Sequence, residues 1–183
     1  GRLSSTPQFL DAPLTMLRAA GYEFLALDAA LERMRAGTQG ARPFAVFTLD
    51  DGYRDNLVHA LPVFAKHECP FAVYVAPGFV DGTTEMWWLA LERMIATQEG
   101  ELQAAGFSAE LDGSAASKWA AWNTLAGPVQ ALPEHEQRAW TRAQAERSGI
   151  DLPQMCRDMI MTWDEVRQLA AHPLATIGAH TLN

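Results

Sequence analysis

The sequence predicts an α/β fold built on parallel strands. Three mostly continuous apolar runs carry this prediction, at residues 44–49, 70–76 and 174–178. Continuous rather than alternating hydrophobicity is typical of strands buried on both faces, as in parallel sheets covered by helices. A helical stretch at residues 55–67 separates the first two runs, and strand, helix, strand is the parallel crossover unit.

The residues before the first of these runs predict two helices and a short strand. Apolar spacing from about residue 7 to 20 indicates a helix, with Pro7 near its start and Gly21 as its stop. A short strand is expected at residues 23–27. Asp28 is expected to cap a second helix that runs to about residue 35, and a Gly-rich loop then leads into the first apolar run.

The middle of the chain interrupts this alternation of strands and helices. Residues from about 84 to 149 read as helices broken by a polar, Gly-rich stretch, and we expect a hairpin around Asp112-Gly113. The alternation resumes at Thr162, which has Glu165 three residues later in the arrangement of a capping box. A last helix and the apolar run at residues 174–178 follow.

Composition excludes several classes of protein. With 49% apolar and 20% charged residues, the chain resembles an ordinary folded globular protein. Its net charge of -8 argues against nucleic acid and anionic membranes and favours neutral or cationic partners. No apolar run approaches the ~18 residues of a transmembrane segment. Cys69 and Cys156 lie in no metal or redox spacing and are expected to be buried or idle thiols. The compartment stays open.

Asp50 and Asp51 stand where the first buried strand ends. Active-site residues of α/β barrels and open sheets collect at this edge. Neighbouring side chains of a strand point to opposite faces, but Gly52 permits a turn that could bring both carboxylates to one cavity. A turn that simply caps the next helix explains Asp-Asp-Gly equally well.

His180 follows the third apolar run and is expected at the same edge of the sheet. A carboxylate from one strand end and an imidazole from another are suitable ligands for zinc or a similar divalent ion. A lone histidine is more often structural, and the remaining ones fit that interpretation: His59, His67, His135 and His172.

Two ordered motifs resemble those of a known family. The segment from Thr48 to Tyr53 resembles the Thr-Phe-Asp-Asp-Gly signature of the polysaccharide deacetylases, the nodulation-type deacetylase domain, with Leu49 in place of Phe. The segment from Trp163 to Thr181 resembles the approach to the second signature, His-Ser/Thr-x-x-His. The resemblance covers most of the chain outside residues 84–150.

The resemblance implies roles for three residues. Asp50 would be the general base, and Asp51 and His180 would be metal ligands, with zinc as the expected ion. The second histidine of the motif is expected immediately after Asn183. The residues that stabilise the oxyanion and protonate the leaving amine are also expected beyond that point, so we expect the sequence to be the front part of a longer chain, inactive by itself.

The resemblance also implies an architecture. The expected fold is part of a distorted (β/α) barrel of the polysaccharide deacetylase type with a mostly helical insertion. Residues 1–83 would form the first part of the barrel, residues 84–150 the insertion, and residues 151–183 the continuation of the barrel up to the second metal motif.

The implied activity is metal-dependent hydrolysis of N-acetyl groups on the amino sugars of a poly- or oligosaccharide, which releases acetate. A non-catalytic saccharide-binding module that keeps the fold is the alternative. An aspartyl-phosphate enzyme would need a second acid usually two residues after the first aspartate, and that position is Gly52.

Tryptophans are concentrated in the expected insertion, and their rings could stack on sugar faces. Helical spacing around Trp88 and Leu91 favours packing in a core instead. The tryptophans of this region are Trp87, Trp88, Trp119, Trp122 and Trp140, and Trp163 stands outside it.

Overall fold

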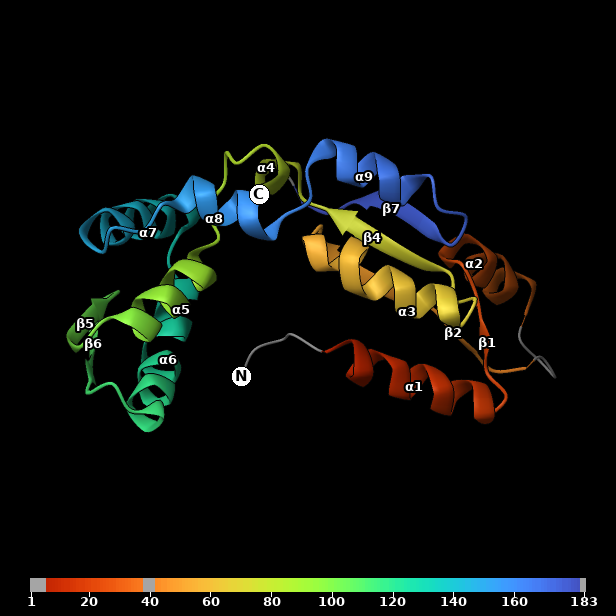
Figure 1. Ribbon diagram of the computed structural model, residues 1–183, viewed down its shortest axis with the longest axis horizontal. Helices are drawn as coiled ribbons and strands as arrows, with labels where there is room; N and C mark the ends of the chain where they lie inside the picture. Colours follow the sequence, from red (N-terminus) through yellow and green to blue (C-terminus); the bar gives the residue numbers. More distant parts are fainter. Residues whose placement is uncertain (1–5, 38–41, 182–183) are drawn as a thin grey trace. The chain divides into compact units, whose positions relative to one another are not determined.

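The computed structural model describes residues 6–37 and 42–181 (Figure 1). The chain divides into two compact units. Unit 1 comprises residues 1–81 and 159–183, and unit 2 comprises residues 82–158. Helices and strands alternate in unit 1, which confirms the predicted α/β class.

Unit 1 contains the residues of both sequence motifs. Before unit 2 begins, the chain forms α1 (Pro7–Ala19), β1 (Glu23–Phe24), α2 (Leu27–Ala36), β2 (Phe44–Ala45), β3 (Phe47–Asp51), the π-helical turn η1 (Asn56–Ala60), α3 (Leu61–Lys66), β4 (Phe71–Val75) and α4 (Pro77–Val80). After unit 2 it forms α9 (Trp163–Ala170) and β7 (Ala175–Ala179).

The strands of unit 1 form two parallel sheets. The larger has the order β3-β4-β7, and the smaller pairs β1 with β2. The three apolar runs of the sequence therefore lie side by side as parallel strands, as predicted, although the first one also supplies β2. The described strands do not establish the distorted barrel, which stays a prediction.

The core of unit 1 is organised by four phenylalanine rings. Phe64 of α3 is fully buried and stacks on Phe71 of β4, with 4.4 Å between the ring centroids. Phe47 contacts Phe64 at 5.6 Å, and Phe24 meets the edge of Phe47 at 5.6 Å. These contacts join β1, β3, α3 and β4, so the sheet is held from one face by a continuous aromatic cluster.

Two local predictions in unit 1 are wrong. The run at residues 44–49 is not buried on both faces, because Thr48 of β3 is exposed and Asp50 after it is exposed too, in alternation with half-buried residues. The second helix begins at Leu27 with Ala26 as its N-cap. Asp28 lies in the first turn instead, where a carboxylate interacts favourably with the helix dipole.

Unit 2 combines helices with one hairpin. Its elements are α5 (Trp87–Thr97), β5 (Gly100–Ala104), β6 (Phe107–Leu111), α6 (Ala115–Gln130), α7 (Glu134–Arg147) and α8 (Leu152–Met159), whose last residue is assigned to unit 1. Its core includes Leu91, Met94 and Leu125, which are fully buried. No helix in the described part of the chain is long and apolar enough to cross a membrane.

The hairpin of unit 2 lies at a different glycine from the one we expected. β5 and β6 are joined at Ala105 and Gly106, which both have positive φ, as a tight two-residue hairpin turn requires. Asp112 instead starts a helix-capping turn, since its Oδ1 accepts a hydrogen bond from the N–H of Ser114 at 2.9 Å. Ser114 in turn caps α6 by accepting from the N–H of Ser117 at 3.1 Å.

Both cysteines are buried free thiols, as predicted. Burial raises the pKa of Cys69 to about 12, against the opposing effect of the Arg18 guanidinium. Burial also raises the pKa of Cys156. Both side chains are therefore protonated at neutral pH and are poor nucleophiles.

Candidate active site

The two sequence motifs meet at the carboxyl-terminal edge of the parallel sheet. Asp51, at the end of β3, is level with Val75 of β4, and Val75 is level with Ala179 of β7. His180 follows Ala179 and donates its backbone N–H to the carbonyl oxygen of Val75 at 2.9 Å. β4 therefore lies between β3, which carries the aspartates, and β7, which precedes the histidine.

A strained turn directs the two consecutive carboxylates toward the same histidine. Asp51 has φ of 67°, and the N–H of Gly52 donates to the carbonyl oxygen of Asp50 at 2.9 Å. A hydrogen bond between residues i and i+2 around a positive φ is typical of the rarer, strained γ-turn. Strained non-glycine residues cluster at functional sites, because the surrounding structure must hold them in place.

Gly52 is required where this turn approaches β4. Its φ is 78°, and a Cβ atom built on it would lie 3.3 Å from Cγ1 of Val75. Both the backbone conformation and the limited space favour glycine over other residues. The third residue of the Asp-Asp-Gly motif therefore positions the first two.

The imidazole of His180 lies between the two carboxylates. Its Nε2 is 4.0 Å from Oδ1 of Asp50, and its Nδ1 is 3.9 Å from Oδ1 of Asp51. These distances are too long for direct hydrogen bonds but suit atoms that face a common ion or water molecule. The side chain of Asp50 is 62% exposed and that of Asp51 is 25% exposed, so the aspartates differ in their access to solvent.

This difference in exposure affects the chemistry of Asp51. Burial raises the pKa of the Asp51 carboxyl, the nearby His180 opposes that effect, and the like charge of Asp50 adds to it. A partly desolvated carboxylate gains more from a bound cation than an exposed one does. Asp51 is therefore better suited to holding a cation, and the more accessible Asp50 to exchanging a proton with bound water or substrate.

The donor atoms fit part of a site for a divalent metal. Zinc takes carboxylate oxygen and imidazole nitrogen at about 2.1 Å in tetrahedral geometry, so two ligand atoms of one ion lie about 3.4 Å apart. The 3.9 Å between Oδ1 of Asp51 and Nδ1 of His180 is slightly longer than this spacing, so a small movement of either side chain would bring both atoms to one ion. Among residues 6–37 and 42–181, no three His, Cys, Asp or Glu side chains could together hold a metal ion. A third ligand of one of these four types would therefore come from outside residues 6–37 and 42–181.

A second set of contacts fixes the turn at residues 50–52, called the site turn below, to the segment that leads into α9. The N–H of Met161 donates to the carbonyl oxygen of Gly52 at 3.0 Å, and Tyr53 pairs with Ile160 in an antiparallel bridge. Nε of Arg54 lies 3.0 and 3.2 Å from the two carboxylate oxygens of Glu165. The turn is therefore held by both backbone and side-chain contacts.

Glu165 has a double role in this arrangement. The predicted capping box is confirmed, since the N–H of Thr162 donates to Oε2 of Glu165 at 2.7 Å and Oγ1 of Thr162 accepts from the N–H of Glu165 at 3.2 Å. Burial alone would raise the pKa of Glu165, but the N–H of Thr162 and the Arg54 guanidinium outweigh it, so the pKa is lowered. The sequence predicted the cap but not the contact with Arg54.

The other histidines with described contacts have structural partners. Nε2 of His67 lies 2.8 Å from Oδ1 of Asp11, which joins α3 to α1. Nδ1 of His172 accepts from the N–H of Leu174 at 3.3 Å, just before β7. His135 is exposed and lies 3.8 Å from Glu136. These contacts agree with the interpretation from the sequence.

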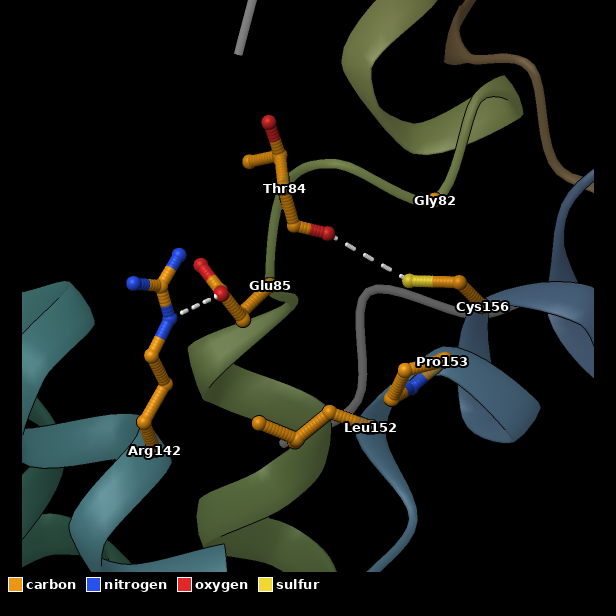
Figure 2. A pocket seen from close by; sticks show the side chains of 7 residues that line it. All are labelled: Gly82, Thr84, Glu85, Arg142, Leu152, Pro153 and Cys156. Carbon is orange, nitrogen blue, oxygen red and sulfur yellow. Dashed lines mark hydrogen bonds and ion pairs between the residues drawn. The ribbon is translucent and has the colours of Figure 1, made fainter.

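A cavity of about 230 Å³ within unit 2 is a weaker candidate site (Figure 2). Glu85 on its wall forms ion pairs with Arg142 and, at 3.1 Å, with Arg138. The thiol of Cys156 donates to the carbonyl oxygen of Thr84 at 3.4 Å. The charged groups at this cavity already bind one another, which leaves little to recognise a ligand.

Comparison with solved structures bears on the fold. The chain is similar to a de-N-acetylase from Aggregatibacter actinomycetemcomitans, with a TM-score of 0.51 and 15% identity over 100% of this chain and 50% of that one. The fold resembles that of a de-N-acetylase. The deacetylase domain of BpsB from Bordetella bronchiseptica also matches, with a TM-score of 0.45 and 15% identity over 99% of this chain and 46% of that domain.

The match to the Aggregatibacter de-N-acetylase agrees with the resemblance inferred from the two motifs at the level of the fold. The chain spans about half the length of the solved structures it matches. No protein-family model and no curated protein matches the sequence.

Proposed function

We propose that the protein hydrolyses N-acetyl groups on the amino sugars of a poly- or oligosaccharide and releases acetate, with the help of a divalent metal, most simply zinc. One observation carries the proposal: Asp50, Asp51 and His180, from two motifs far apart in the sequence, face one another at the carboxyl-terminal edge of a parallel sheet. The fold supports it, because it resembles that of a de-N-acetylase.

In the proposed reaction, Asp51 and His180 hold the ion, and the exposed Asp50 removes a proton from the attacking water. A bound divalent cation would polarise the acetyl carbonyl and lower the pKa of water. The water oxygen bonds to the carbonyl carbon, the C–N bond breaks, and the amine leaves with a proton. The groups that protonate the amine and stabilise the oxyanion are not assigned among the described residues.

The test compares variants of the three residues in the intact protein, using acetate release from N-acetylglucosamine oligomers together with zinc titration. Asp50→Asn should lower turnover by roughly 10²–10⁴-fold and leave zinc bound, because it removes the base alone. Asp51→Asn and His180→Ala should weaken zinc binding itself. Loss of zinc in the Asp50 variant would contradict these roles.

Two exposed residues of the same segment provide matched controls. Asp55→Asn and His59→Ala make the same chemical changes outside the site and should leave both turnover and zinc affinity near wild type. Wild-type protein that binds saccharide and zinc but releases no acetate would favour the non-catalytic binding module instead.

A further inference from the structure

The segments that carry Trp163 and Asp81 both begin at the carboxyl-terminal edge of the sheet, where the candidate active site lies. Trp163 is the first residue of α9 and stands two residues after Met161, whose N–H binds the carbonyl oxygen of Gly52. Asp81 follows α4, which is the first element after β4 (Figure 1). Both residues therefore follow segments that end at the edge where Asp51 and His180 meet.

The indole of Trp163 is held in one orientation although it is exposed. Its Nε1–H donates to Oδ1 of Asp81 at 2.7 Å, over 82 residues of sequence. The capping box of Thr162 and Glu165 fixes the backbone at this point. Even so, Trp163 keeps 41% of its surface accessible. The indole therefore combines an accessible apolar surface with an N–H that is already hydrogen-bonded within unit 1.

We propose that Trp163 is a stacking platform for a pyranose ring of the saccharide, at a position next to the sugar that is deacetylated. The inference rests on the proposed function for its substrate class. The apolar C–H face of a pyranose packs on an indole ring, and the ring offers a large contact area at low entropic cost because it is already oriented. Asp81 acts as a positioning residue for the indole.

This role differs from that of the other exposed tryptophan. Trp119 of α6 is 55% exposed, but it belongs to unit 2 and no hydrogen bond of its indole is described. The two residues therefore form a matched pair of similar exposure, in which the ring of Trp163 is oriented by a hydrogen bond within unit 1 and no such bond is described for Trp119.

The test measures the binding of N-acetylglucosamine hexamer to the intact protein by calorimetry, with the monosaccharide as a short probe. Trp163→Ala should weaken hexamer binding about tenfold, and binding of the monosaccharide should change little because it fills only the position of the sugar that is deacetylated. Trp163→Phe should recover most of the affinity, since it keeps a ring. Asp81→Ala should cost about two- to threefold by releasing the indole, and Trp119→Ala should have no effect.

The outcomes separate this inference from the proposed function. Hexamer binding that follows this pattern supports the platform even if the protein releases no acetate. Equal losses in the Trp163 and Trp119 variants, a Phe variant as weak as the Ala variant, or no hexamer binding by the wild type would overturn it. Thermal unfolding of each variant shows whether the protein is still folded. If Trp163→Ala does not fold, the comparison of Trp163→Phe with the wild type still tests the inference.

Discussion

Replacing Gly52 and two other glycines by alanine tests whether the close approach of the site turn to Val75 of β4 requires glycine at position 52. Gly52→Ala would impose a side chain on a residue with φ of 78° and would bring its Cβ to 3.3 and 3.4 Å from the two methyl groups of Val75. The left-handed conformation costs about 1 kcal/mol for alanine, and relieving the close contacts costs about 1 kcal/mol more. We therefore expect a loss of about 2 kcal/mol in the free energy of unfolding.

Two further glycines of unit 1 separate the cost of the left-handed backbone conformation from the cost of the close contacts. Gly21 has φ of 84° with nothing within 4 Å of a built Cβ, so Gly21→Ala should show the conformational cost alone, about 1 kcal/mol. Gly178 has no such φ, but its Cβ would lie 2.7 Å from the ring of Tyr74, so Gly178→Ala should show a steric cost of about 1–3 kcal/mol.

Urea unfolding of the three variants, followed by circular dichroism, gives the free energies to be compared. A Gly52→Ala variant no less stable than Gly21→Ala would refute the idea that Val75 constrains the turn. If the reasoning holds, Gly52→Ala should also reduce acetate release, because the turn directs both aspartates toward His180.

Three other predictions follow from the same contacts. Phe64→Ala should lose about 3–5 kcal/mol in the free energy of unfolding, because the ring is fully buried; a loss below about 1 kcal/mol in urea would contradict the assigned core. Because folding raises the pKa of Asp51, this carboxyl stabilises the fold below its unfolded pKa, and the contribution is lost as pH rises through the folded pKa. Without metal, the free energy of unfolding of the wild type should therefore fall relative to that of Asp51→Asn over this pH rise. A difference between the two free energies that stays constant with pH would refute the shift. Glu165→Gln should lower the free energy of unfolding in urea by about 1 kcal/mol, and by less at high salt, because salt screens the partly exposed pair with Arg54. A loss that does not change with salt would indicate that only the helix cap contributes.

Local patterns in the sequence predicted the elements that carry the site. The strands before Asp51 and His180 were visible as apolar runs, and the capping box of Thr162 needs only residues within one helical turn. Parallel pairing then places both strand ends at one edge, so the meeting of the two motifs could be expected without coordinates. The roles of the three residues remain predictions.

Features that depend on distant partners could not be predicted in the same way. The exposure of one face of β3 depends on which distant elements pack against that face, and the residues of the strand do not reveal this. The contacts of Arg54 with Glu165 and of Trp163 with Asp81 join residues 111 and 82 positions apart. Either Gly106 or Gly113 could have formed the hairpin, and the choice depended on Ala105 adopting a conformation that alanine rarely takes.

The chain leaves unit 1 after Asp81 and returns at Met159, and both ends of this excursion are fastened within unit 1. Trp163 holds Asp81 by a hydrogen bond, and Tyr53 pairs with Ile160. For a loop closed at fixed points, each doubling of length costs only about 0.6 kcal/mol of closure entropy. Residues 82–158 can therefore lengthen, shorten or change in sequence at little cost to the stability of unit 1.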